Sequence, residues 1–321
     1  MDAAGPPCMG AAALAALLLA GCGGGWEDDS PPAQQEIEPL WAQWYASPPD
    51  AAQCRPGVLH EAVKQQALDK LNAIRALHGL RPVVYDADSD AQLMQTVMMM
   101  QANQATSHHP PSSWACYSEA GASGARASNL ASWQGVRSAP SADWAMHSWL
   151  HDATNLVPDN VGHRRWMLDP FLKKVAYGID MALRDGRWHS YAALKVIYED
   201  EQARTDGWAR DGFVAYPVGD YPLRHWHENA LLSFGVLADA NDRGANQAVD
   251  FGQATVRVTR PDGSALPISE WRYDNRRYGL PNNVQFKAEG VTHGVAYTVH
   301  IDGVLVQGVP RNYSYRFRLQ P

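Results

Sequence analysis

Residues 159–170, DNVGHRRWMLDP, place one histidine between a glycine and two arginines. An imidazole titrates near neutral pH and can bind a metal or move a proton, so His163 is a candidate site residue. The structural alternative is that His163 hydrogen-bonds the backbone and fixes its loop, while Arg164 and Arg165 contact carboxylates. We expect His163 to do both, holding the loop and lining a cleft.

Two other groups of histidines have spacings that suggest chemistry. His147 and His151 lie four residues apart, which is metal-ligand spacing on a helix, but Ser148 stands where a zinc protease needs its catalytic glutamate. We therefore expect them to be ordinary surface histidines. Residues 224–228, RHWHE, could bind a cation or a glycan ring through Trp226. We favour the alternative that this segment packs at a domain interface.

The first half of the chain has helical periodicity followed by a hairpin. Apolar residues recur at helical spacing over residues 58–78, with Gly79 as the C-terminal cap, and again over 88–106 and 141–153. Residues 118–128 are rich in Gly, Ala and Ser and predict a loop. The stretches KKVAYGIDMAL and RWHSYAALKVIYE, joined by Asp185-Gly186, predict a hairpin. Helices with a closing hairpin indicate an α+β fold.

From about residue 213 the sequence is all-β in character. Short alternating runs such as ATVRVT and YSYRFRL are separated by the turn signals PDG, PNN and DG. This pattern predicts a small antiparallel sandwich. The charged, glycine-containing stretch at residues 200–210 marks the boundary, so we expect a first domain over 57–203 and a β-sandwich domain over 211–321.

The N-terminal segment resembles a bacterial lipoprotein signal. The apolar run of residues 9–25, MGAAALAALLLAGCGGG, is too short to span a bilayer and contains the lipobox Leu-Ala-Gly-Cys ending at Cys22. This resemblance implies a signal peptide over 1–21, an acyl chain such as palmitate on Cys22, and a flexible tether over 22–56. Because Gly23 is not the aspartate associated with inner-membrane retention, we expect an exported protein held in the cell envelope, at the outer membrane of a two-membrane bacterium.

The cysteine count agrees with export. The chain has four cysteines; Cys8 is lost with the signal and Cys22 is acylated, which leaves Cys54 and Cys116. In an oxidising compartment these two are the remaining disulfide pair, and two unpaired buried thiols are the alternative.

Composition and charge exclude one class of protein. The 321 residues include 45% hydrophobic and 19% charged residues, which is typical of globular chains. The formal net charge is -7, and no basic block stands out. We therefore expect no nucleic-acid partner.

A series of short motifs resembles the CAP superfamily, also called SCP-like, which comprises the cysteine-rich secretory proteins, antigen 5 and the pathogenesis-related proteins. The motifs come in family order over about residues 59–198: LNAIRALHGLRPVVYD, SHH, SNLA, SWLHD, GHRRWML and VAYG. The resemblance implies a three-layer α-β-α sandwich, followed here by the small all-β domain, with a central cleft built from four separated segments.

The same resemblance implies which residues line that cleft. The family has two histidines and two acids there, and the motif positions fall on five residues and one neighbour: His108 with His109 as the alternative, His163, Asp152, and Ser128 beside Asn129. Ser128 stands where the family has glutamate. It could be imagined as a nucleophile, but no Gly-x-Ser-x-Gly motif surrounds it.

The missing glutamate decides which chemistry is expected. His108, His163 and Asp152 form a possible Zn²⁺ site, but a hydroxyl in place of a carboxylate makes it a poorer one. It also leaves Asp152 as the only carboxylate near the pair that can accept a proton. We therefore expect a cleft that binds a small ligand, a lipid or a divalent metal without catalysis. The alternative is a metal-dependent hydrolase acting on envelope peptides or peptidoglycan, and a further alternative is a purely adhesive role.

Overall fold

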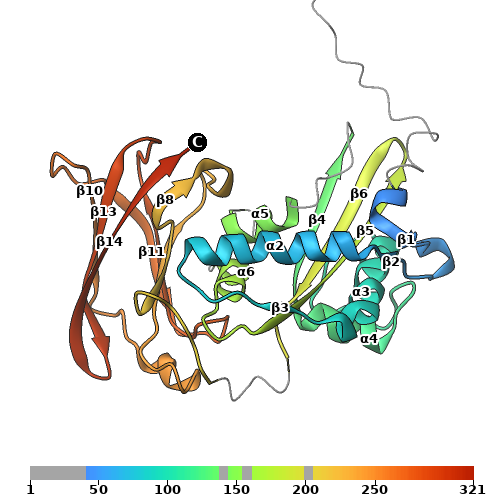
Figure 1. Ribbon diagram of the computed structural model, residues 1–321, viewed down its shortest axis with the longest axis horizontal. Helices are drawn as coiled ribbons and strands as arrows, with labels where there is room; N and C mark the ends of the chain where they lie inside the picture. Colours follow the sequence, from blue (N-terminus) through green and yellow to red (C-terminus); the bar gives the residue numbers. More distant parts are fainter. Residues whose placement is uncertain (1–40, 137–143, 154–160, 199–204) are drawn as a thin grey trace, which may run out of the picture.

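The computed structural model describes residues 41–136, 144–153, 161–198 and 205–321. Cys22 and the predicted signal and tether up to residue 40 lie outside these ranges. The architecture is α+β, as expected: an α/β domain is followed by a β-sandwich (Figure 1). No helix in the described ranges is both long enough and apolar enough to cross a membrane.

The first domain is built on a four-stranded sheet in the order β3-β5-β6-β4. Its strands are β3 (Val84–Tyr85), β4 (Ser128–Gly135), β5 (Lys174–Arg184) and β6 (Arg187–Lys195). β5 and β6 form the predicted hairpin, with Asp185 and Gly186 at its turn. The middle of both strands is buried on both faces, which requires helices on each side. The sheet is thus the middle layer of three.

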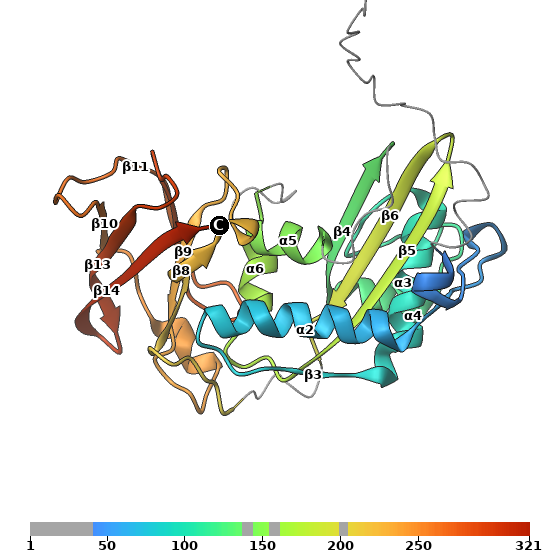
Figure 2. The same ribbon diagram turned by 45° about the horizontal axis from the view of Figure 1, so that its top comes forward.

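The helices divide between the two faces of this sheet. They are α2 (Glu61–Leu77), α3 (Asp90–Asn103), α4 (Glu119–Arg126), α5 (Trp144–His151) and α6 (Gly162–Met167). Gly178 of β5 packs closely on Leu93 of α3, which places α3 on one face. Asn129 of β4 donates to the His163 carbonyl of α6 on the opposite face (2.9 Å). Figure 2 shows α5 and α6 between the sheet and the β-sandwich.

The predicted loop at residues 118–128 is wrong, because most of it forms helix α4. The Ser118 hydroxyl caps the helix by accepting from the Gly121 amide (3.0 Å). The small residues that suggested a loop form the buried face of the helix, where Gly121 and Gly124 pack tightly on α3. Tertiary packing thus outweighs the weak helix propensity of glycine.

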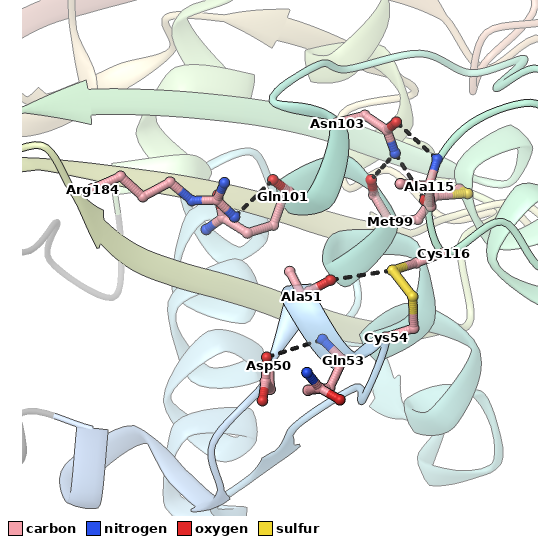
Figure 3. The surroundings of a disulfide bond; sticks show 10 residues. All are labelled: Asp50, Ala51, Gln53, Cys54, Met99, Gln101, Asn103, Ala115, Cys116 and Arg184. Carbon is pink, nitrogen blue, oxygen red and sulfur yellow. Dashed lines mark hydrogen bonds between the residues drawn. A yellow bond between two sulfur atoms is a disulfide. The ribbon is translucent and has the colours of Figure 1, made fainter.

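Short segments attach the described N-terminal part of the chain to this domain. Strands β1 (Tyr45–Ser47) and β2 (Val58–Leu59) pair with each other, and the 3-10 helices η1 (Ala51–Gln53) and η2 (Ala87–Ser89) precede Cys54 and α3. The Cys54–Cys116 disulfide is present, as predicted (Figure 3). It bridges residues 62 positions apart. A cross-link over a loop of that length stabilises a fold by about 4 kcal/mol in the chain-entropy estimate.

The second domain is a sandwich of two four-stranded sheets, ordered β10-β13-β14-β8 and β11-β12-β9-β7. Phe234 of β9 stacks on Tyr315 of β14 across the interior, with ring centroids 6.1 Å apart. The strands are β7 (Phe213–Tyr216), β8 (Gly219–Pro222), β9 (Leu232–Val236), β10 (Thr255–Thr259), β11 (Ile268–Asp274), β12 (Asn283–Ala288), β13 (Ala296–Val306) and β14 (Val309–Gln320), with the 3-10 helices η4 (Leu223–His225) and η5 (Gly244–Ala248). The prediction of a purely antiparallel sandwich is wrong in one place, because β8 crosses from the sheet of β7 and runs parallel to β14.

The two domains share a polar interface. The imidazole of His78, at the end of α2, donates from Nδ1 to the Ala215 carbonyl of β7 (2.7 Å) and contacts the Tyr221 hydroxyl with Nε2 (3.1 Å). On α6, Arg164 donates to the Leu231 carbonyl (2.8 Å) and Arg165 pairs with Asp274 (2.8 Å). Consecutive residues of α6 thus fix the sandwich in place beside the first domain.

Candidate functional site

A pocket of about 300 Å³ lies where β4, α6 and the sandwich meet. Residues from distant parts of the chain line it: His108, His109, Arg126, Ser128, Asn129, Gly162, His163, Trp166, Ile197, Arg277 and Tyr278. The structure thus brings together five of the six residues expected in the cleft. The sixth, Asp152, lies behind the pocket wall.

His108 is positioned by the backbone of α4. Its Nδ1 lies 2.9 Å from the Ala125 carbonyl, and because a carbonyl can only accept, Nδ1 carries the proton. Nε2 is then the basic nitrogen of the neutral ring. Burial lowers the pKa of His108; the Ala125 bond opposes this, and the nearby His163 lowers it further. His108 is therefore mainly neutral at pH 7.

Asp152 holds His163 from behind. It follows the last residue of α5 in a left-handed conformation (φ 51°), which turns its carboxylate toward α6. His163 Nδ1 lies 2.9 Å from Asp152 Oδ1, and the Arg164 amide donates to Oδ2 (3.2 Å). The Asp152 side chain is fully buried, while that of His163 is 19% exposed. Asp152 thus orients the imidazole and leaves Nε2 as the nitrogen that faces outward.

Ser128 and Asn129 begin strand β4, directly after α4. Asn129 is used structurally, since its amide donates to the His163 carbonyl. Ser128 is only 4% exposed, and its hydroxyl has no hydrogen-bond partner within the described residues. A buried hydroxyl without a partner is uncommon in native proteins. Among the lining residues, Ser128 therefore has an unused donor and acceptor.

The residues present do not fit the usual zinc set. Zinc in proteins takes at least three side-chain ligands, and the described part of the chain contains no group of three His, Cys, Asp or Glu residues placed to share an ion. His108 and His163 offer one nitrogen each. Both oxygens of Asp152 are already engaged, by His163 and the Arg164 amide. The expected third ligand is thus a positioning residue.

The sandwich contributes a wall that the sequence did not reveal. Arg277 and Tyr278 follow β11 and line the pocket from the second domain. Gly279, with φ +55°, lets this loop approach the Arg165 carbonyl so closely that a Cβ would collide with it. In the sequence, Gly279 after Arg-Arg-Tyr indicates a close approach of the backbone, but it does not indicate which surface this loop contacts.

The two other histidine groups predicted from the sequence lie at the domain interface. The prediction that His147 and His151 are surface residues is wrong, because both are half-buried. His147 contacts His225 (5.1 Å between ring centroids), and His151 contacts His227 (5.6 Å). Trp226, which lies between His225 and His227 in the sequence, stacks on Tyr216 (5.9 Å between ring centroids). The prediction that residues 224–228 pack at the domain interface is therefore confirmed.

Comparison with known proteins agrees with this geometry. Residues 68–189 match the family described as CAP, the cysteine-rich secretory protein family. The matched segment includes His108, Ser128, Asp152 and His163 and ends before the sandwich. No curated protein matches the chain. Residues 68–189, with the described residues that complete their sheet, therefore form a domain of the CAP family, and a β-sandwich follows this domain in the chain.

Proposed function

We propose that this protein is a lipid-anchored CAP-domain protein of the bacterial cell envelope whose pocket binds a small anionic ligand without transforming it. The family, whose members are generally secreted, and the disulfide both support an exported protein. The ligand class follows from the charges around the pocket.

The lining of the pocket is the observation that carries the proposal. Arg126, Arg277 and three imidazoles line it, and none of the lining residues in the described part of the chain is acidic. The whole chain has a net charge of -7, so this lining is opposite in sign to the rest of the molecule. Arg126 is partly engaged by Glu119 (2.7 Å), whereas Arg277 has no ion-pair partner among the described residues. A carboxylate or phosphate is the complementary group.

The remaining lining indicates the other half of the ligand. Trp166, Tyr278 and Ile197 supply apolar surface beside the cations, and the unpartnered Ser128 hydroxyl offers a donor. An anion carrying a ring or a short hydrocarbon group satisfies both parts of the pocket. A volume of about 300 Å³ limits the ligand to a small molecule or the end of a larger one.

Binding to the pocket is tested with two aromatic probes of opposite charge. We expect isothermal titration of the full chain to detect phenyl phosphate and not benzylamine. Arg277→Ala is expected to weaken phenyl phosphate binding at least tenfold, because it removes the lining arginine that has no ion pair with any described residue. Arg276→Ala is the matched control, since Arg276 is the adjacent exposed arginine outside the lining. Equal loss in both variants, or tighter binding of benzylamine, would contradict an anion site.

One observation supports a second candidate, a hydrolase. The Asp152 carboxylate fixes the Nδ1 proton of His163, which is the arrangement that orients a histidine general base. Ser128 lies in the same pocket but makes no hydrogen bond to His163. Prolonged incubation with phenyl acetate separates the two functions: turnover abolished by both His163→Ala and Asp152→Asn would favour hydrolysis over binding alone.

The anchor is tested independently of the pocket. In bacteria that express the full chain, metabolic labelling with a palmitate analogue is expected to mark the protein, and Cys22→Ala is expected to abolish the label and release the protein from the membrane fraction. Cys8→Ala is the control, because Cys8 lies before the lipobox. Label that persists in Cys22→Ala would contradict acylation at this residue.

A further inference from the structure

A second and larger pocket, of about 830 Å³, lies beside the disulfide, and none of the residues that line the histidine pocket lines it. Its walls come from four places: the segment around η1, the C-terminal end of α3, the loop that carries Ala115 and Cys116, and the end of β5. Figure 3 shows part of this region, with Ala51 and Cys54 on one side and Gln101 and Arg184 on the other. Trp41, Pro48, Pro49 and Leu183 give it apolar surface.

Two buried acceptors in its lining have no hydrogen-bond donor among the described residues. Asp180 of β5 is 2% exposed and Gln101 of α3 is fully buried. The Gln101 amide donates to Asp180 Oδ1 (3.2 Å) and to the His189 carbonyl (3.0 Å), which uses both of its protons. Asp180 Oδ2 and Gln101 Oε1 then remain without any hydrogen bond in the described part of the chain. Leaving such groups unsatisfied is costly, so they are suited to receive donors.

No cation of the described ranges supplies those donors. Arg184 is the charged side chain closest along the strand, but its guanidinium donates to the backbone carbonyl of Gln101 (3.3 Å, Figure 3). No lysine, arginine or histidine of the described ranges lies within ion-pair distance of Asp180. The other carboxylate in the lining, Asp50, is already paired with Arg55 (2.7 Å). Asp180 is thus the one lining acid that lacks a cation.

We propose that this pocket is a second binding site, for a primary amine whose ammonium group donates to Asp180 Oδ2 and Gln101 Oε1 while its hydrocarbon part lies against Trp41, Pro48 and Leu183. An ammonium has three donors and a positive charge, which matches two adjacent acceptors, one of them a carboxylate. A hydroxyl has one donor and no charge, and a carboxylate ligand would be repelled. The proposal goes beyond the anionic ligand of the histidine pocket and does not depend on it.

The acid itself makes binding depend on pH. Burial raises the pKa of Asp180 to about 7, although the Gln101 hydrogen bond and the charge of Arg184 act to lower it. The carboxylate is therefore mostly ionised at pH 8 and mostly protonated at pH 5.5. An alkyl ammonium remains charged at both pH values, so only the protein titrates. From a pKa of about 7, amine affinity is expected to fall about thirtyfold from pH 8 to pH 5.5.

The test compares three six-carbon probes on the full chain at pH 8: hexylamine, hexanol and hexanoate. We expect isothermal titration to show hexylamine binding at least tenfold more tightly than hexanol, and no binding of hexanoate. Repeating the hexylamine titration at pH 5.5 on the unaltered protein should show the loss described above. Equal affinity for hexylamine and hexanol, or unchanged amine affinity at pH 5.5, would overturn the proposal.

Two matched variants assign the site. Asp180→Asn keeps the size of the side chain, removes a buried charge and is expected to reduce hexylamine affinity at least tenfold. Asp185→Asn removes the same charge from the exposed turn of the same hairpin, outside the pocket, and asparagine tolerates its left-handed backbone (φ 50°). It should bind like the unaltered protein. Amine binding retained in Asp180→Asn would overturn the site, while phenyl phosphate binding in the same variant reports separately on the histidine pocket.

Discussion

Replacing Arg164 with methionine is expected to lower the free energy of unfolding by about 4 kcal/mol or more, the largest effect we expect from one substitution. Arg164 is 1% exposed and joins the two domains. Its guanidinium donates to the carbonyls of Leu150 (2.6 Å) and His151 (2.6 Å) in the CAP domain. It also donates to the Leu231 carbonyl (2.8 Å) and the Ser233 hydroxyl (3.0 Å) of the sandwich.

The size of the effect follows from what methionine leaves behind. The substitution deprives four buried or half-buried acceptors of their donor, and each such loss costs about 1 to 3 kcal/mol where water cannot take its place. It also removes a cation that lies 3.8 Å over the ring of Tyr216. Burial lowers the pKa of Arg164, while Tyr216 and the nearby Asp152 carboxylate act to raise it. No carboxylate of the described residues forms an ion pair with the guanidinium, so these acceptors supply its hydrogen bonds.

Chemical denaturation of the full chain measures the loss, with two comparisons. Arg187→Met removes an exposed arginine from the hairpin and should change the free energy of unfolding by no more than about 0.5 kcal/mol. Arg164→Lys should recover only part of the stability, because one ammonium cannot reproduce the planar fork that reaches both domains. A methionine variant as stable as the Arg187 control would show that this interface contributes little.

The positions of the functional residues in sequence explain how much of the site could be predicted. His108 and His163 lie in short motifs within one domain, so motif order was enough to expect both in one cleft. Asp152 was expected to line the cleft, but its left-handed backbone turns it behind His163. A single backbone conformation of this kind has no sequence signature for aspartate, since several residue types adopt it at the end of a helix.

Contacts between the domains were harder to predict for a different reason. Arg277 lies in a loop of the sandwich, and its place in the pocket depends on how two independently patterned domains pack together. Hydrophobic periodicity reports which face of an element is buried, but not which partner covers it. The unsatisfied oxygen of Asp180 could not be predicted for the same reason. Alternation along β5 places Asp180 on the face that α3 covers, but it does not indicate that Gln101 donates to only one of the two carboxylate oxygens.

The second large effect is on pH dependence, at His78. This imidazole is buried between the domains, where it contacts the rings of Tyr216 and Tyr221. Burial lowers its pKa to about 3; the hydrogen bond to the Ala215 carbonyl opposes the shift, and the charges of Arg164, His225 and Arg75 add to it. We expect His78 to contribute stability above pH 6.5, where the unfolded chain is also neutral, and to lose that contribution as the pH falls toward 3.

The direction follows from proton binding. Between pH 6.5 and 3 the unfolded chain binds a proton at this position and the folded chain does not, so acid favours unfolding. From pH 7.5 to pH 4.5 the loss amounts to about 3 kcal/mol, at 1.36 kcal/mol for each pH unit below 6.5. Asp180 acts in the opposite sense, because its raised pKa, about 7, makes the folded chain the better proton binder over the same range. His151, whose pKa is also lowered to about 3, mainly by burial, acts in the same direction as His78. The pH dependence of the unaltered protein therefore combines several groups, and only a difference between variants isolates His78.

His78→Phe provides that difference, because phenylalanine keeps a ring between the two tyrosines and cannot titrate. At pH 7.5 we expect the variant to be less stable than the unaltered protein by about 1 to 3 kcal/mol, since the Ala215 carbonyl loses its donor. At pH 4.5 the gap should close by about 3 kcal/mol, so that the variant equals or exceeds the unaltered protein. Tyr221→Phe is the control: it loses the other hydrogen bond of His78 but keeps the titrating imidazole, so its difference from the unaltered protein should change far less with pH. If His78→Phe stays equally far below the unaltered protein at both pH values, the buried imidazole does not make the domain interface sensitive to acid.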